Sequence, residues 1–411
     1  MIKILNQNQK IQEAIQQKHK LALARVIDDK TLGFHQVTQR ENLWTTSQQI
    51  ADDFRKKYKT LVVMGIGGSA LGGRVIKEAL AFKTDREILF WDNVDPILMD
   101  SQLKKLDGKL ETVGWAVISK SGNTIETLTQ CDYVAQFYKA KNLNWTKQVV
   151  VITEPRENPL SNFAKKFEIP QLEVPLDVGG RFSVLTPVGL FPAAFLGLNI
   201  NLLKAGANKA LADVETVTAL TALSEQSFIN QEWITVFWTY SELLKTFGFW
   251  IQQLWAESLA KKVCRDNKTQ APRASTPMPC MGATDQHSIL QQIAEGYKDK
   301  FVVFIRSEQS ESQGQIINES LFNNMYHMNG KPFGQLLKAE AIATQAALTE
   351  HGVSNITITT PSMNEELLGY LFMYFELVVA TIGESMNINT FNQPGVELGK
   401  VIAKDLLIKG L

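Results

Sequence analysis

The stretch WAVISKSGNTIET, residues 115–127, decides the fold class of this 411-residue chain. Its apolar, β-branched start stops at hydroxyls, a lysine and a glycine, and a helical pattern follows. This order predicts a strand that enters a loop at a helix N-terminus, where unpaired backbone N–H groups and the positive end of the helix dipole meet. Such a loop can bind a phosphate dianion through the hydroxyls of Ser119, Ser121 and Thr124. For this segment in isolation, an ordinary strand–helix turn with a serine cap is the alternative. We call residues 119–124 the hydroxyl loop.

The same order of elements recurs along the first half of the chain. The apolar run 60–64 leads to a glycine turn at 65–69 and a helical pattern to about Phe82. After the hydroxyl loop, a helical pattern runs to about Ala140, and a further apolar run follows at 148–153. Strands that alternate with helices in this way predict a parallel sheet with helices on both faces.

The chain divides by pattern into four parts. We expect a polar helical segment over 1–35, a first α/β sandwich over 36–205 and a second over 206–388. In the second, Phe228–Lys262 looks like long aromatic-rich helix, whereas 301–306 and 355–360 look like strands. A turn and a last helix fill residues 389–411.

Composition excludes several classes of partner. The 42 basic and 42 acidic residues cancel, so neither nucleic acid nor an anionic membrane surface is indicated. Three cysteines without paired spacing fit a reducing compartment, and the N-terminus lacks the apolar core of a signal peptide. The uncharged run 182–203 contains polar residues and two prolines, which favours a buried helix after a polar loop over a membrane span. We therefore expect a soluble, cytoplasmic protein.

The glycine turn GIGGSALGG begins at Gly65. A dinucleotide site would need an acidic ribose ligand about 20 residues on, and Asp95 lies too far along the chain. We favour a loop whose backbone approaches a sugar phosphate, with contacts from Gly67, Gly68 and Ser69.

Two charged side chains are candidates for the chemistry. Arg181 follows two flexible glycines in DVGGRFS and is either a structural ion pair or a clamp on substrate negative charge. Glu257 shares a helix face with Gln253 at i, i+4. Two neighbouring tryptophans predict a poorly solvated carboxylate that suits a general base, and a solvated pair with Lys261 is the alternative.

Two further side chains have weaker individual signals. His287 follows Thr284 and Asp285, either of which suits a helix cap, so the imidazole is expected in a first helical turn. The turn NQPG presents Gln393, and Lys400 follows in the last helix. A surface histidine and a solvated lysine are the alternatives.

Together these segments resemble the glucose-6-phosphate isomerase family, whose motif order they follow from about residue 60 to the C-terminus. The matching motifs are GIGGS at 65–69, SKSGNT at 119–124, GGRFS at 179–183, QxxxES at 253–258, QHS at 286–288 and QPGVELGK at 393–400. The resemblance implies two sugar-isomerase (SIS-type) three-layer α/β/α sandwich domains with mainly parallel sheets and a C-terminal helical tail. It also implies a homodimer with active sites between subunits. The implied reaction converts glucose 6-phosphate to fructose 6-phosphate without metal or organic cofactor.

The resemblance also implies a role for each site residue. Glu257 would move a proton between C1 and C2 through a cis-enediol, and Arg181 would stabilise the enediolate oxygen. His287, from the partner subunit, and Lys400 would assist ring opening, with Lys400 in a C-terminal turn and helix that completes the site. Gln393 would orient the substrate. The phosphate would be bound by Ser119, Lys120, Ser121 and Thr124, with Ser69 and Gln253 nearby.

Three other functions stay open at this stage. A dual phosphoglucose/phosphomannose isomerase would differ in pocket shape, which motifs do not report. A non-catalytic sugar-phosphate sensor could keep the hydroxyl loop, but it would have no reason to hold the four candidate catalytic residues together. A nucleotide-binding oxidoreductase is the most distant alternative.

Overall fold

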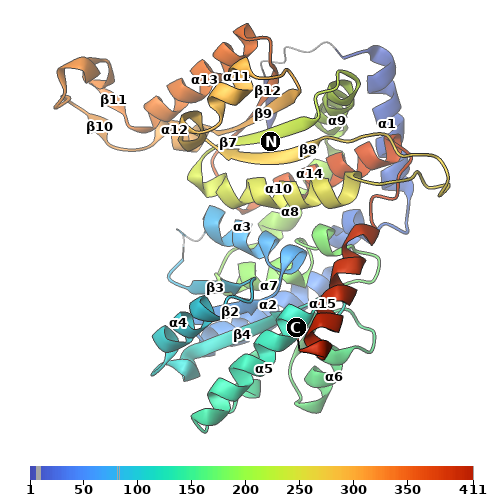
Figure 1. Ribbon diagram of the computed structural model, residues 1–411. Helices are drawn as coiled ribbons and strands as arrows, with labels where there is room; N and C mark the ends of the chain where they lie inside the picture. The colour runs from blue at the N-terminus through green and yellow to red at the C-terminus, as the bar shows by residue number, and fades with distance from the viewer. Residues whose placement is uncertain (6–10, 81, 83, 411) are drawn as a thin grey trace.

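The computed structural model describes residues 1–5, 11–80, 82 and 84–410 (Figure 1). Two five-stranded sheets lie at opposite ends of the molecule, and helices that include α3 (Leu71–Leu80), α8 (Ile200–Ala212) and α10 (Lys245–Leu259) lie between them (Figure 1). The expected α/β class with mainly parallel sheets and a C-terminal helical tail is confirmed.

The first sheet is wholly parallel and has the order β3-β2-β4-β5-β6. Its central strands are apolar runs with every residue buried, because helices cover both faces. The strands are β2 (Thr60–Met64), β3 (Glu87–Trp91), β4 (Val113–Ile118), β5 (Val149–Thr153) and β6 (Gln171–Glu173). The remaining helices of this half are α2 (Glu41–Lys57), α4 (Pro96–Leu106), α5 (Ile125–Ala140), α6 (Pro159–Lys166) and α7 (Pro187–Phe195).

The second sheet has the order β1-β12-β9-β7-β8 and is parallel except for its edge strand β1. Its strands are β1 (Lys3–Leu5), β7 (Ile234–Tyr240), β8 (Thr276–Met281), β9 (Lys300–Ser307) and β12 (Ser354–Thr360). The helices around it are α1 (Glu13–Asp28), α9 (Val214–Ile229), α11 (Leu290–Glu295), α12 (Glu308–Ser312), α13 (Gly334–Glu350) and α14 (Glu365–Ser385). Beyond it, α15 (Glu397–Lys409) ends the described chain.

Two expectations of secondary structure need correction. The helical reading of Phe228–Lys262 missed β7, a buried aromatic and β-branched run that periodicity cannot distinguish from a helix segment. The N-terminal segment is not helical throughout, because β1 pairs antiparallel with β12 and places Lys3 opposite Thr359. Residues 6–10 of that segment lie outside the described residues. The domain division itself stays a prediction, and α8 continues across its 205/206 boundary.

Helix α14 is the central helix of the second half. By length and composition it is the one helix in the described part of the chain that is apolar enough to cross a membrane, yet 94% of its apolar window is buried inside the protein. It packs against α8, α9 and α10 as a core helix does. The uncharged run 182–203 likewise contains the buried helix α7, which begins with Pro187 at its first position.

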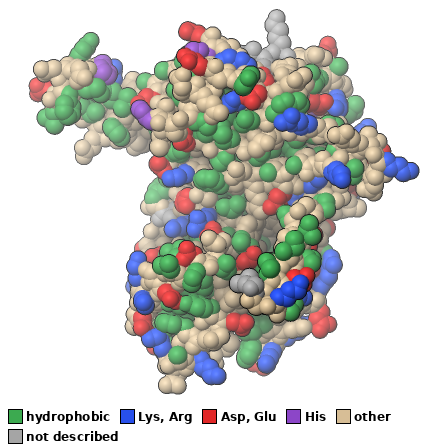
Figure 2. Space-filling model, in the orientation of Figure 1, with side chains coloured by type: hydrophobic (Ala, Val, Ile, Leu, Met, Phe, Trp, Pro, Cys, Tyr) green, Lys and Arg blue, Asp and Glu red, His purple; other side chains and the backbone are tan. Residues whose placement is uncertain are grey.

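An arm extends from the second half at residues 313–333. Its two short strands, β10 (Ile316–Ile317) and β11 (Lys331–Pro332), pair antiparallel and project away from both sheets (Figure 1). The arm exposes several large apolar side chains, which Figure 2 shows as a hydrophobic surface at its tip.

Candidate active site

Loops at the carboxyl ends of the first sheet's strands meet one face of α10. Strands β2 and β4 are parallel neighbours, so the glycine turn and the hydroxyl loop that follow them lie at one sheet edge. They enclose a cavity of about 350 Å³ together with α10 and the segment before α15. It is lined by Ile66, Gly68, Ser69, Lys120, Ser121, Thr124, Glu154, Gly179, Gly180, Arg181, Gln253, Glu257, Phe391 and Gln393.

The hydroxyl loop has the predicted strand–loop–helix geometry. Strand β4 ends at Ile118, and Thr124 is the N-cap position of α5. Ser119 is buried, and its Oγ lies 2.7 Å from Thr124 Oγ1, so it holds the threonine instead of lining the cavity. Gly122 has a φ of 65°, and a Cβ there would overlap the side chain of Asn158. The loop therefore presents Lys120, Ser121 and Thr124 to the cavity.

The two glycine motifs touch each other across the cavity wall. A Cβ on Gly68 would lie 2.3 Å from the carbonyl oxygen of Gly180, so this approach requires glycine. Gly67 has a φ of 57° and lies next to Gln253 rather than in the cavity lining. Ser69, next to Gly68, and Arg181, next to Gly180, both line the cavity.

Glu154 is a cavity residue that no sequence motif indicated. It directly follows β5, and its backbone N–H donates to the carbonyl of Lys120 at 3.0 Å. Burial lowers the pKa of Lys120, and the nearby carboxylate of Glu154 opposes that shift. The one usable signal was its place after a strand next to β4, because neighbouring parallel strands end at one edge.

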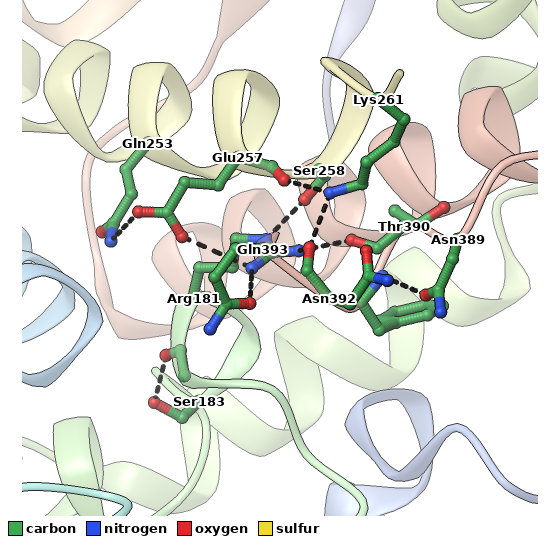
Figure 3. A network of polar contacts seen from close by, with 12 residues as sticks. Arg181, Ser183, Gln253, Glu257, Ser258, Lys261, Asn389, Thr390, Asn392 and Gln393 are labelled. Carbon is green, nitrogen blue, oxygen red and sulfur yellow. Dashed lines mark hydrogen bonds and ion pairs between the residues drawn. The ribbon is translucent and has the colours of Figure 1, made fainter. Parts of the chain in front are cut away.

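Arg181 is buried, and all of its donor nitrogens are engaged (Figure 3). Its Nε donates to Ser258 Oγ at 2.7 Å, and Nη1 donates to Glu257 Oε2 at 3.3 Å and to Gln393 Oε1 at 3.0 Å. Its Nη2 donates to the backbone carbonyls of Thr390 and Asn392. Burial lowers the pKa of the guanidinium, and the charge of Glu257 opposes this. The arginine thus joins α10 to the segment 389–393.

Glu257 points from α10 toward Arg181 and Gln393 (Figure 3). Its Oε1 accepts from Gln253 Nε2 at 3.0 Å, as the i, i+4 spacing predicts. The expected poorly solvated environment is wrong, since the side chain is 34% exposed and faces polar groups while the tryptophans are buried. Its carboxylate pairs with Arg181, and Lys261 instead binds its backbone carbonyl.

His287 and Lys400 do not reach this cavity within one chain. His287 is exposed and is the last residue of a 3-10 turn, so the expected first helical turn is wrong. The Asp285 side chain accepts from the Met281 backbone N–H at 2.7 Å, upstream of the turn, and therefore caps no helix. Lys400 lies on exposed α15, where its Nζ donates to Glu397 at 2.7 Å.

This fold and site fit the sugar-isomerase class expected from the sequence: parallel α/β units with a hydroxyl-rich loop facing a carboxylate and a guanidinium. The fold resembles that of tagatose-6-phosphate ketose/aldose isomerase from Escherichia coli, with a TM-score of 0.56, 16% identity and 93% and 95% of the two chains covered. It also resembles a hypothetical protein from Thermus thermophilus, with a TM-score of 0.86, 30% identity and 96% and 94% coverage.

The chain belongs to the phosphoglucose isomerase family, whose model matches residues 40–409. A glucose-6-phosphate isomerase of Thermus thermophilus is 35% identical over 351 residues, which cover 84% of this chain and 83% of the relative. That of Carboxydothermus hydrogenoformans is 33% identical over 379 residues, with 88% and 81% covered. These matches confirm the family resemblance and do not favour the three alternative functions.

Proposed function

We propose that this protein interconverts glucose 6-phosphate and fructose 6-phosphate. The observation that carries the proposal is the cavity in which the carboxylate of Glu257 lies 3.3 Å from the buried guanidinium of Arg181, opposite the hydroxyl loop. Relatives named glucose-6-phosphate isomerase support the choice of substrate. The substrate phosphate would accept from Ser69, Lys120, Ser121 and Thr124.

The reaction needs one base and one stabiliser of negative charge. Glu257 takes the proton from C2 of the open-chain aldose, and the electrons of that bond form a C1–C2 double bond while the C1 oxygen gains negative charge. Arg181 stabilises this oxygen. The hydroxyl proton on O2 moves to O1, and Glu257 returns its proton to C1, so the ketose has the same atoms as the aldose.

Substrate entry would exchange contacts at Arg181. Both donors of its Nη1 are engaged by Glu257 and Gln393, whose side chains line the cavity. A substrate oxygen can replace one of them without moving the buried Nε and Nη2 contacts. Gln393 is therefore placed to bind and orient the sugar.

We infer that the functional unit is a homodimer to which the partner subunit supplies a histidine for ring opening. His287 is exposed and outside its own chain's cavity, which leaves it accessible to a second copy. A cleft of about 990 Å³ between α3 and α10 opens beside Glu257 and gives such a residue an entry path. The arm 313–333 is suited to hold the second copy, because Leu321 is 94% exposed and Phe322 is also exposed.

We also propose that α15 completes the site after substrate binds. None of its residues is buried, and the turn before it contains Gly395, around which no neighbouring atom would restrict a Cβ. A rotation of the helix there would bring Lys400 toward the substrate hydroxyls. A cytoplasmic location is supported by three buried cysteines that are free thiols.

Two experiments test the proposal. Glu257→Gln should remove nearly all turnover of fructose 6-phosphate in a coupled dehydrogenase assay, while calorimetry still detects sugar-phosphate binding; turnover like wild type would reject the base. The double change Leu321→Asp, Phe322→Asp should give monomers by light scattering and low activity. Tyr297→Asp removes an exposed aromatic side chain outside the arm and should leave the dimer intact.

A further inference from the structure

Lys261 makes two short contacts next to the reacting groups. Its Nζ lies 2.5 Å from the backbone carbonyl oxygen of Glu257 and 2.6 Å from that of Asn392 (Figure 3). The side chain is half-buried. Among the residues that the structure describes, no carboxylate lies within ion-pair distance of this ammonium, so its charge is directed at carbonyl dipoles.

The first carbonyl belongs to the last turn of α10. This helix ends at Leu259, so the carbonyl of Glu257 is among the four that have no partner further along the helix. A cation at a helix C-terminus is favoured by the helix dipole. Lys261 therefore caps the turn that carries the base.

The second carbonyl belongs to the segment that holds Arg181 and Gln393. The oxygen of Asn392 accepts from Arg181 Nη2 at 3.2 Å as well as from Lys261. Arg181 contacts the Glu257 carboxylate in turn, so Lys261, Glu257, Arg181 and Asn392 close a ring of contacts. The ring connects α10 to residues from the far end of the chain.

We propose that Lys261 is a positioning residue for the isomerisation: its ammonium fixes the spacing between the base on α10 and the segment that carries Gln393. The inference rests on the proposed function and adds a residue to it. A shift of about 1 Å between reacting groups can lower a rate about 100-fold. The positioning contact of Lys261, which we call the clamp, therefore affects turnover more than substrate binding.

The electrostatic setting gives the clamp a pH dependence. Burial and the positive charge of Arg181 lower the pKa of Lys261 to about 8, although the Glu257 carboxylate opposes this. On its outer side Lys261 lines a cavity of about 680 Å³ together with Asp29, Lys262 and Arg265. Above that pKa the amine loses its charge, whereas an arginine at this position would stay charged.

The test compares Lys261→Met and Lys261→Arg with Lys262→Met, an adjacent exposed lysine outside the ring. Lys261→Met should lower kcat about 10- to 100-fold and change KM less than about threefold, because only the spacing of the reacting groups is lost. Lys261→Arg should restore most of kcat and keep it to higher pH than wild type. Lys262→Met should behave like wild type.

A wild-type kcat in Lys261→Met, or equal effects on KM and kcat, would overturn the inference. If that variant does not fold, the Lys261→Arg pH profile decides, and an alkaline limb identical to that of wild type rejects the clamp. Glu257→Gln distinguishes this failure from a failure of the proposed function. Full activity in Glu257→Gln would reject Glu257 as the base. An inactive Glu257→Gln together with a wild-type-like Lys261→Met would reject only the positioning role of Lys261.

Discussion

Replacing Arg181 by lysine keeps the positive charge but removes the shape of the donor group. The guanidinium contacts five acceptors, on Ser258, Glu257, Gln393, Thr390 and Asn392. A lysine ammonium has three donors, so at least two of these five hydrogen bonds are lost. At about 1.5–3 kcal/mol for each hydrogen bond to a charged group, the loss is about 3–6 kcal/mol. The lost hydrogen bonds weaken the packing of segment 389–393 against α10.

The catalytic effect should be large although the positive charge is kept. Removing one preorganised donor from an oxyanion site lowers kcat about 100- to 1,000-fold, and the lysine also lets Gln393 and the base move apart. We expect Arg181→Lys to lower kcat by this factor or by more. Initial rates with fructose 6-phosphate, measured through a coupled dehydrogenase, give kcat directly.

A matched control separates position from residue type. Arg156 is 64% exposed, near the cavity residue Glu154 but outside the cavity lining, and Arg156→Lys should keep wild-type kcat. If Arg181→Lys loses less than about tenfold of kcat, the planar donor set is not what stabilises the transition state and the reasoning fails.

Three other outcomes follow from the same contacts. Glu376 is fully buried, and burial raises its pKa, so the free energy of unfolding of the wild type falls as pH rises above the ordinary pKa of 4.5. Glu376→Met should therefore gain stability relative to wild type by up to about 1.4 kcal/mol for each pH unit above the ordinary pKa of 4.5. This gain should be visible as a pH-dependent difference in Tm that is absent at about pH 4. Glu154→Gln removes a carboxylate from the cavity proposed to bind the substrate phosphate and should bind inorganic phosphate about tenfold more tightly by calorimetry at low salt, whereas Glu157→Gln, outside the cavity, should not. Gly68→Ala should lower activity strongly, because its Cβ meets the rigid backbone of Gly180; normal kinetics would contradict this close approach.

Local sequence determined the elements whose signal is contiguous. The hydroxyl loop was readable because an apolar strand, the hydroxyls and the helix start lie within residues 115–127, and each acts on its immediate neighbours. The same holds for the i, i+4 contact between Gln253 and Glu257. Repeated strand–turn–helix units then predicted parallel sheets, because such crossovers leave few other topologies.

The tertiary structure alone decided which distant segments meet. Strand β1 pairs with β12 from the other end of the chain, and Glu154 enters the cavity because β5 lies beside β4 in the sheet. The segment 389–393 accepts hydrogen bonds from Arg181, and Lys261 joins this segment to α10. Such contacts depend on sheet order and helix packing over the whole chain, so no short window of residues contains them. The apolar pattern of a segment predicts that the segment will be buried. Which segments it packs against depends on all the other segments that must be buried with it.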